Sequence, residues 1–255
     1  MTEMKTALIT GATSGFGAAI ARRLVRDGFR VAVTGRRRDR LDGLTDELGS
    51  DRCLALEFDV RDRHACLEAV RNLPWEYAAL DVFVNNAGGA RGLDSADKAD
   101  LDDWDWMVDV NVKGLMYMAR AVLPSMVARG SGLVVNMGSV AGTYPYPGGN
   151  VYGAVKAFVH QFSLNLRADL VGSGVRVTSI EPGLAETEFS LVRFKGDAEK
   201  ANAVYRGTTP LSAEDIAGIV SWLSQLPPHV NINVLEVMSE AQAFGPFVVK
   251  RNGMP

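Results

Sequence analysis

Short apolar segments alternate with amphipathic segments along the chain, and this alternation most constrains the fold. Helical spacing of apolar residues occurs at 18–24, 40–48, 103–129 and 152–170. Segments with the length and composition of buried strands lie between them, at 6–10, 30–34, 53–58, 80–84, 132–137, 175–180 and 232–237. Strands that are apolar on both faces need cover on both faces, so the pattern predicts a parallel sheet between two layers of helices.

Right-handed crossovers between parallel strands predict a doubly wound, Rossmann-type α/β fold. No linker rich in proline, serine or charge interrupts the 255 residues, so we expect a single domain over 1–255. The least regular stretch follows the sixth strand, at the sheet edge where such folds bind ligands. We expect residues from about 184 to about 210 to form a lid there.

Composition and charge narrow the class of function. The net charge of −3 gives no long-range attraction for nucleic acid, so no nucleic-acid partner is expected. The chain has no secretory signal pattern and no run approaching the roughly 20 apolar residues that span a bilayer. We therefore expect a cytoplasmic protein that does not enter membranes. No metal site is expected, because no metal-ligand spacing links the cysteines and histidines, which are Cys53, Cys66, His64, His160 and His229.

A glycine-rich loop joins the first predicted strand to the first predicted helix. It reads Thr10-Gly11-Ala12-Thr13-Ser14-Gly15-Phe16-Gly17, with the spacing G-x-x-x-G-x-G. Glycines let the backbone turn sharply and approach a pyrophosphate, while the N–H groups at the start of the helix bind the same anion. The loop therefore predicts a dinucleotide site whose residues are Gly11, Thr13, Ser14, Gly15, Phe16 and Gly17.

The end of the second strand indicates which nicotinamide cofactor binds. An NAD site usually has an acidic residue there to hold the ribose 2′-hydroxyl, but this chain has Gly35-Arg36-Arg37-Arg38 and its first acid is Asp39. Guanidinium groups bind a 2′-phosphate through charge-assisted hydrogen bonds. We therefore predict NADP as the cofactor, held by Arg36 and Arg37. The alternative is that these arginines are a solvated helix start, which is our interpretation of Arg38.

The third strand ends in Asp59-Val60. A carboxylate at this position can accept a hydrogen bond from an adenine amino group, and the Val60 backbone can support the ring. We therefore include both residues in the predicted cofactor site. The alternative is that Asp59 caps the helix that follows.

Tyr152 and Lys156 lie four residues apart in a predicted helix and so share one face of it. A phenol, with a pKa of about 10, is a weak base at neutral pH, but a nearby ammonium group favours the phenolate. We expect Lys156 to lower the pKa of Tyr152, which can then exchange a proton with a reacting oxygen. Ser139 follows the fifth strand, and its hydroxyl could hold the same oxygen.

Taken together, these motifs resemble the short-chain dehydrogenase/reductase family over essentially the whole chain. Asn85-Asn86-Ala87-Gly88 matches its N-N-A-G motif, and Pro182-Gly183 matches the P-G motif beside the nicotinamide. The resemblance implies that Tyr152 is the acid/base, that Ser139 positions the substrate oxygen, and that Lys156 binds the nicotinamide ribose. It implies that Asn111 holds a water for proton relay. It also adds cofactor-binding residues, namely Asn85, Asn86, Ala87, Gly88, Tyr152, Lys156, Pro182, Gly183 and Thr187.

Further stretches are similar to the NADP-dependent 3-hydroxy acid dehydrogenases, which include L-serine 3-dehydrogenases, also described as malonic semialdehyde reductases. These stretches are 35–37, 144–153, 161–167, 187–197 and 229–233. The similarity implies oxidation at the 3-hydroxyl of L-serine, L-allo-threonine or 3-hydroxyisobutyrate, reduction of the matching semialdehydes, and a homotetramer. The chain departs from this subfamily at Gly89-Ala90-Arg91-Gly92, at Ser239 and from Ala241 onward, which leaves the substrate open.

Two alternatives to a hydroxy-acid dehydrogenase remain, a reductase of bulkier ketones or aldehydes and a non-catalytic NADP(H)-binding sensor. A hydroxy-acid enzyme needs a cation for the substrate carboxylate, and the predicted lid offers Arg193 first and Lys195 second. We predict Ser139, Tyr152 and Arg193 as substrate-binding residues, with Arg91 as a rival to Arg193. The alternative for Arg193 and Lys195 is a solvated surface, or contact with cofactor phosphates or a neighbouring subunit.

Overall fold

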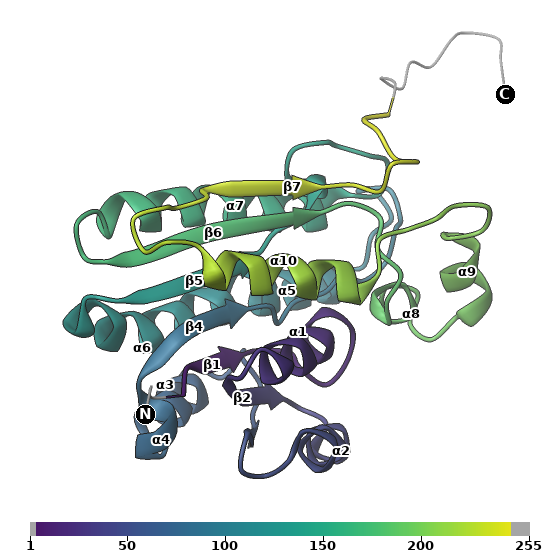
Figure 1. The fold of residues 1–255 in the computed structure, drawn as a ribbon. Helices are drawn as coiled ribbons and strands as arrows, with labels where there is room; N and C mark the ends of the chain where they lie inside the picture. The colour runs from purple at the N-terminus through teal and green to yellow at the C-terminus, as the bar shows by residue number, and fades with distance from the viewer. Residues whose placement is uncertain (1–3, 246–255) are drawn as a thin grey trace, which may run out of the picture.

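The computed structural model describes residues 4–245, and its centre is a seven-stranded parallel sheet with strand order β3-β2-β1-β4-β5-β6-β7 (Figure 1). The strands are β1 (Thr6–Ile9), β2 (Arg30–Gly35), β3 (Cys53–Glu57), β4 (Leu80–Asn85), β5 (Gly132–Met137), β6 (Val175–Pro182) and β7 (Val234–Val237). Every neighbouring pair is parallel. The order reverses direction after β3, where the chain returns to the far side of β1. The doubly wound Rossmann-type fold predicted from the sequence is confirmed.

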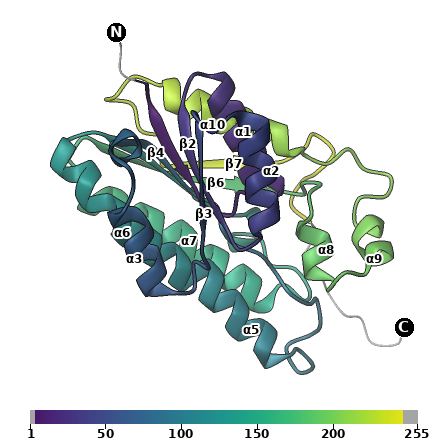
Figure 2. The same ribbon diagram turned by 90° about the horizontal axis from the view of Figure 1, so that it is seen from below.

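Helices cover both faces of this sheet (Figure 2). One layer contains α1 (Gly15–Arg26), α2 (Arg38–Leu48) and α10 (Ala213–Gln225). The other contains α3 (Arg63–Arg71), α5 (Leu101–Val108), α6 (Gly114–Arg129) and α7 (Asn150–Asp169), with the short α4 (Trp75–Ala78) at its edge. Each layer encloses its own apolar cluster against the sheet, one containing Ile20 and Ile216, the other Met118 and Val155. Alternate strand residues supply the two clusters, because successive side chains point to opposite faces.

The long helix predicted at 103–129 starts earlier and is not a uniform α-helix. Asp100 caps its start at Leu101 by accepting a hydrogen bond from the Asp102 N–H. A π-helical turn, η1 (Asp109–Lys113), joins α5 to α6. The Asn111 side chain donates to the Met107 carbonyl four residues earlier, so a polar side chain competes for the helix's own acceptors. Apolar spacing alone does not reveal such a turn.

The apolar pattern predicted no helix between the third and fourth strands, but α3 lies there. Asp62 begins this helix, since its side chain accepts from the N–H groups of His64 and Ala65. Cys66 is the one fully buried residue of α3. Ser212 and Asp215 form a capping box at the start of α10, in which each side chain bonds the other residue's N–H.

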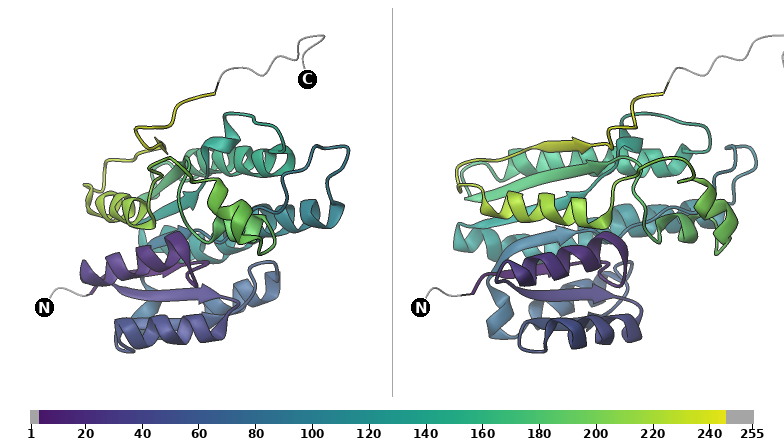
Figure 3. Two further views of the ribbon diagram at one scale, coloured as in Figure 1. Left: turned by 90° about the vertical axis from the view of Figure 1, so that its right-hand side faces the viewer. Right: turned by 45° about the vertical axis from the view of Figure 1, so that its right-hand side comes forward.

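Residues 184–210 lie at the carboxyl ends of the strands, toward which the strand arrows point (Figure 3). They contain two short helices, α8 (Phe189–Arg193) and α9 (Ala198–Ala203). Ala185 pairs with Leu211 in a single parallel bridge, which brings the two ends of the segment together. In residues 4–245, no helix is both long enough and apolar enough to cross a bilayer.

Candidate active site

The glycine-rich loop presents backbone N–H groups at the carboxyl end of β1. Ser14 precedes α1 in an extended conformation, and its side chain makes no cap hydrogen bond to the helix. Gly11 has a φ of +66°, a left-handed conformation that glycine adopts without strain. A Cβ atom on Gly17 would lie 2.4 Å from the Gly11 carbonyl oxygen, so the loop packs too closely for any side chain there. The start of α1 therefore lacks a side-chain cap, and its binding of a pyrophosphate stays a prediction.

The Asn85-Asn86-Ala87-Gly88 stretch fastens this loop to β4. The Asn86 side chain donates to the carbonyls of Thr10, at 2.8 Å, and Gly11, at 3.2 Å. The Thr10 hydroxyl accepts in return from the N–H groups of Asn86 and Ala87, both at 2.9 Å. Asn85 is buried and donates to the Leu115 carbonyl of α6. These bonds account for a structural role of the motif, and its contact with a cofactor stays a prediction.

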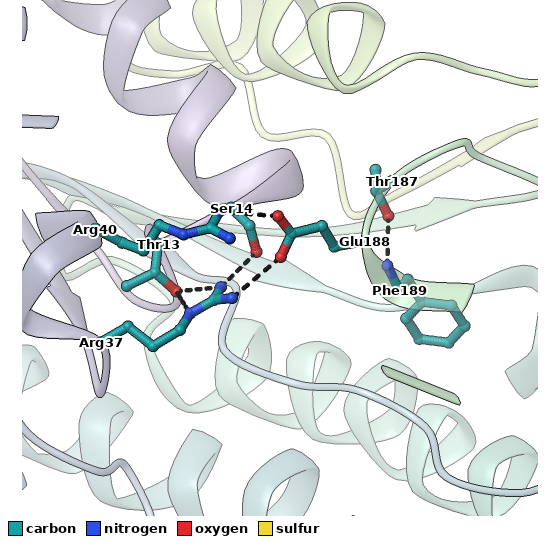
Figure 4. Close-up of polar contacts among 7 residues, drawn as sticks. All are labelled: Thr13, Ser14, Arg37, Arg40, Thr187, Glu188 and Phe189. Carbon is teal, nitrogen blue, oxygen red and sulfur yellow. Dashed lines mark hydrogen bonds and ion pairs between the residues drawn. The ribbon is translucent and has the colours of Figure 1, made fainter. Parts of the chain in front are cut away.

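Arg37 lies directly over the loop, whereas Arg36 does not. The Arg37 guanidinium donates to the hydroxyls of Thr13, at 2.8 Å, and Ser14, at 2.9 Å (Figure 4). Arg36 extends into solvent, with its nearest acidic partner, Asp59, at 3.7 Å. Arg38 pairs with Asp42 on the exposed side of α2, in agreement with its interpretation as a solvated residue. Of the two predicted phosphate ligands, Arg37 is thus the one already oriented by the loop.

Asp59 does not cap the helix that follows, because Asp62 does, so that alternative is wrong. The Asp59 carboxylate instead accepts from the Arg61 N–H at 3.0 Å and from the Arg61 guanidinium at 2.7 Å. Burial alone would raise the pKa of Asp59, but the bonds from Arg61 outweigh it and hold the pKa below its usual value. Val60 is buried against Gly114 of α6. Their contact with an adenine ring stays a prediction.

Three of the four predicted catalytic side chains converge at the end of β5. Tyr152 and Lys156 are both buried on one face of α7, and the Lys156 ammonium lies 5.8 Å from the centroid of the Tyr152 ring. Lys156 donates to the Met137 carbonyl at 2.9 Å. Ser139 begins the 3-10 turn η2 (Val140–Gly142) and accepts from the Ala141 N–H at 3.1 Å.

The pKa values of Tyr152 and Lys156 differ from those expected from sequence. Burial raises the pKa of Tyr152, against the opposing effects of a hydrogen bond with Ser139 and the positive charge of Arg193. Burial also lowers the pKa of Lys156 to about 8, against the attraction of Glu181. The expectation that Lys156 holds the pKa of Tyr152 below its usual value is therefore wrong for this structure. The Tyr152 phenolate and the Lys156 ammonium would both lose solvation where they are buried on α7, and this loss favours a neutral phenol.

Asn111, the fourth predicted residue, is buried in the π-helical turn. Its side chain donates to the carbonyls of Gly89, at 2.8 Å, and Met107, at 2.9 Å, and it accepts from the Gly89 N–H at 3.2 Å. A Cβ atom on Gly88 would lie 2.6 Å from Asn111 Oδ1 and 3.6 Å from Lys156 Nζ. Asn111 thus holds the chain that passes beside Lys156, and the water implied by the resemblance stays a prediction.

Among the three basic residues weighed for substrate binding, Arg193 alone faces the tyrosine. Its guanidinium carbon lies 5.6 Å from the centroid of the Tyr152 ring, and its Nη2 donates to the Tyr146 hydroxyl at 2.8 Å. Lys195 instead pairs with Asp103 at 2.8 Å. The guanidinium carbon of Arg91 lies 4.1 Å from the centroid of the Trp106 ring, and its Nη1 lies 3.9 Å from Asp103.

The 184–210 segment contributes contacts that sequence reasoning did not assign. Phe189 packs on Tyr152 with ring centroids 5.5 Å apart, and Glu188 pairs with Arg37 and Arg40. Thr187, a predicted cofactor residue, lies against the loop, with its Cβ 3.4 Å from the position of a Cβ on Gly15. The predicted Pro182-Gly183 pair is joined to β7 by the bond from Gly183 N–H to the Val237 carbonyl. No local pattern predicts pairs between residues about 150 positions apart.

Comparison with known proteins identifies the family. A family model described as short chain dehydrogenase matches residues 5–197. The NADP-dependent 3-hydroxy acid dehydrogenase YdfG of Salmonella typhi is 56% identical over 246 residues, which are 96% of this chain and 99% of that protein. Serine 3-dehydrogenase of Rhizobium radiobacter is 50% identical over 96% of this chain and 98% of its own.

A solved structure described as the closed form of serine dehydrogenase complexed with NADP+ is 54% identical, with a TM-score of 0.95. It covers 97% of this chain and 100% of its own. Serine dehydrogenase from Escherichia coli is 50% identical over 94% of this chain and 100% of its own, with a TM-score of 0.82. This chain therefore belongs to the short chain dehydrogenase family.

Proposed function

We propose that this protein transfers a hydride between NADP(H) and the 3-hydroxyl of small 3-hydroxy acids such as L-serine, L-allo-threonine or 3-hydroxyisobutyrate, or the corresponding semialdehydes. The observation that carries the substrate class is the position of Arg193, a cation beside the ring of the proton-transferring Tyr152. The prediction of an NADP-dependent oxidoreductase acting on CH–OH groups is confirmed by the relatives, which are named as NADP-dependent dehydrogenases.

The carboxyl edge of the sheet fits a dinucleotide phosphate. The start of α1 has no side-chain cap, and a Cβ atom on Gly17 would close the space that the loop leaves. We assign the pyrophosphate to the loop, the 2′-phosphate to Arg36 and Arg37, the adenosine to Asp59, Val60 and Asn85–Gly88, and the nicotinamide end to Pro182, Gly183 and Thr187. When bound there, the cofactor supplies or accepts the hydride.

Tyr152 moves the proton in this proposal. Burial keeps its phenol protonated, which is the form that donates a proton to a carbonyl oxygen during reduction. In the oxidation direction the same oxygen, as the phenolate, takes the proton of the substrate hydroxyl. Ser139 lies just after the end of β5, and in this proposal its hydroxyl holds the reacting oxygen in line.

Arg193 binds the substrate carboxylate in this proposal. Its Nε donates to the Gly92 carbonyl and its Nη2 to the Tyr146 hydroxyl, and these two bonds fix the plane of the guanidinium. A planar guanidinium held in this way can give a carboxylate two parallel hydrogen bonds. That arrangement would orient the acid so that its carbon 3 faces the hydride.

The test compares substrates in the Arg193→Gln variant. Loss of a charge-assisted bond costs about 1.5–3 kcal/mol, so we expect the KM for a hydroxy acid to rise by roughly tenfold or more. An uncharged alcohol or ketone of similar size should keep its KM. Lys195→Gln is the matched control, since it removes a positive charge two residues away that is already paired with Asp103. An equal loss with charged and uncharged substrates would assign Arg193 to the structure and the carboxylate site elsewhere.

We also propose a cytoplasmic homotetramer that uses the outer face of α7. Phe158 and Phe162 stack there with ring centroids 5.6 Å apart, and both are only partly buried in the single chain. Light scattering during gel filtration measures the assembly, and a monomer at micromolar concentration would contradict it.

The proposed cytoplasmic location is supported by Cys53 and Cys66. Both thiols are free and buried, which suits a reducing compartment.

A further inference from the structure

A single carboxylate joins the 184–210 segment, the proposed lid, to the arginines at the end of β2. Glu188 accepts from Nη1 of Arg37 at 3.1 Å and from Nη1 of Arg40 at 2.9 Å (Figure 4). Its two oxygens are used separately, Oε2 for Arg37 and Oε1 for Arg40. The bonds cross the carboxyl edge of the sheet from the lid, which follows β6, to the start of α2, which follows β2.

Glu188 also completes the orientation of Arg37. The Nε and Nη2 atoms of that guanidinium are engaged by the hydroxyls of Thr13 and Ser14, and Glu188 takes the remaining Nη1. Burial acts to raise the pKa of Glu188, but the bonds from Arg40 and Arg37 outweigh it and leave the pKa below its usual value. The carboxylate is therefore charged at neutral pH.

The residues on either side of Glu188 contact the two functional ends of the site. Thr187 packs on Gly15 of the glycine-rich loop, and Phe189 packs on the ring of Tyr152. Three consecutive residues thus contact the proposed pyrophosphate loop, the proposed 2′-phosphate arginines and the acid/base. A displacement of Glu188 would move all three contacts together, because a peptide chain of this length has little slack.

We propose that Glu188 is a positioning residue that fastens the lid across the cofactor groove through Arg37 and Arg40 and so slows the release of NADP(H). This inference rests on the proposed function, in which Arg37 holds the 2′-phosphate. A guanidinium has five N–H donors and four of those on Arg37 are used, so one N–H of Nη1 is left for the phosphate while Glu188 stays bound. The other end of α8 is fastened separately, by the ion pair between Lys195 and Asp103.

The test is the Glu188→Gln variant, which keeps the size of the side chain and removes its charge. Stopped-flow fluorescence measures NADPH dissociation, and trypsin reports lid opening through cleavage at Arg193, Lys195, Lys200 and Arg206. We expect dissociation about fivefold faster, the size of effect that a partly exposed ion pair gives, and faster cleavage in the lid. Asp42→Asn is the matched control, since it breaks the 2.8 Å pair with Arg38 on the same helix without touching the lid.

A double variant shows whether Glu188 acts through Arg40. Adding Arg40→Gln to Glu188→Gln should increase the dissociation rate no further if the two side chains form one fastening. Unchanged dissociation and cleavage in Glu188→Gln would overturn the inference. Slower dissociation would also overturn it, since Glu188 would then compete with the cofactor phosphate for the arginines. None of these readouts needs turnover, so a wild type that binds NADPH but oxidises no hydroxy acid would contradict the proposed function alone.

Discussion

Replacing Lys156 by methionine should make the fold more stable even as it removes a proposed catalytic group. Lys156 is buried, and burial lowers its pKa to about 8 from the 10.5 of a solvated lysine. That difference corresponds to about 3 kcal/mol by which the folded state disfavours the charged ammonium. Methionine has a similar length and no charge. Its gain is reduced by about 1 kcal/mol, because the bond from Lys156 to the Met137 carbonyl is lost.

The pH dependence is the more specific part of this prediction. The folded pKa of Lys156 lies below the unfolded one, so the unfolded chain binds more protons between about pH 8 and 10.5. The free energy of unfolding of the wild type should therefore rise by about 2 kcal/mol between pH 7 and 9.5 relative to the variant. The advantage of Lys156→Met is then largest near neutral pH and shrinks as the pH increases.

Urea unfolding at several pH values measures this difference. Lys113→Met is the matched control, because Lys113 is half exposed and its bond with Asp109 raises its pKa. That variant should show no comparable change between pH 7 and 9.5. A constant difference between wild type and Lys156→Met over this range would refute the reasoning, since Lys156 would then stay fully charged in the folded state.

Four further predictions concern the reaction and its cofactor. Tyr152→Phe should lower turnover at least 100-fold while NADPH still binds, as steady-state kinetics and fluorescence titration would show. Because burial raises the pKa of Tyr152, oxidation should still be increasing above pH 9, and a flat profile would count against the phenolate as base. Arg36→Ala with Arg37→Ala should weaken NADP+ far more than NAD+, whereas equal wild-type efficiency with both would contradict the assignment. Gly17→Ala should abolish cofactor binding, because its Cβ would meet the Gly11 oxygen, and calorimetry with NADP+ measures the loss.

The arrangement of the fold was accessible from sequence because it depends on short-range patterns. Apolar strands alternate with amphipathic helices, and Gly11 and Gly15 of the cofactor loop adopt the positive φ that glycine favours. The Ser212 cap with Asp215 is also readable, since its two partners lie three residues apart. The π-helical turn was missed because apolar spacing does not show that the Asn111 side chain bonds the carbonyls of Met107 and of Gly89, which is 22 residues away.

The residues themselves determined the fold and the order of the motifs, whereas the tertiary structure alone decided their surroundings. Burial set the pKa of Tyr152 against the effect that the nearby lysine suggested, because desolvation depends on the atoms packed around a group. Folding also paired Lys195 with Asp103, brought Arg193 to Tyr152, and joined Glu188 to arginines about 150 residues away. Electrostatic and packing energies fall with distance in space, and a linear pattern specifies such distances only between near neighbours in the chain.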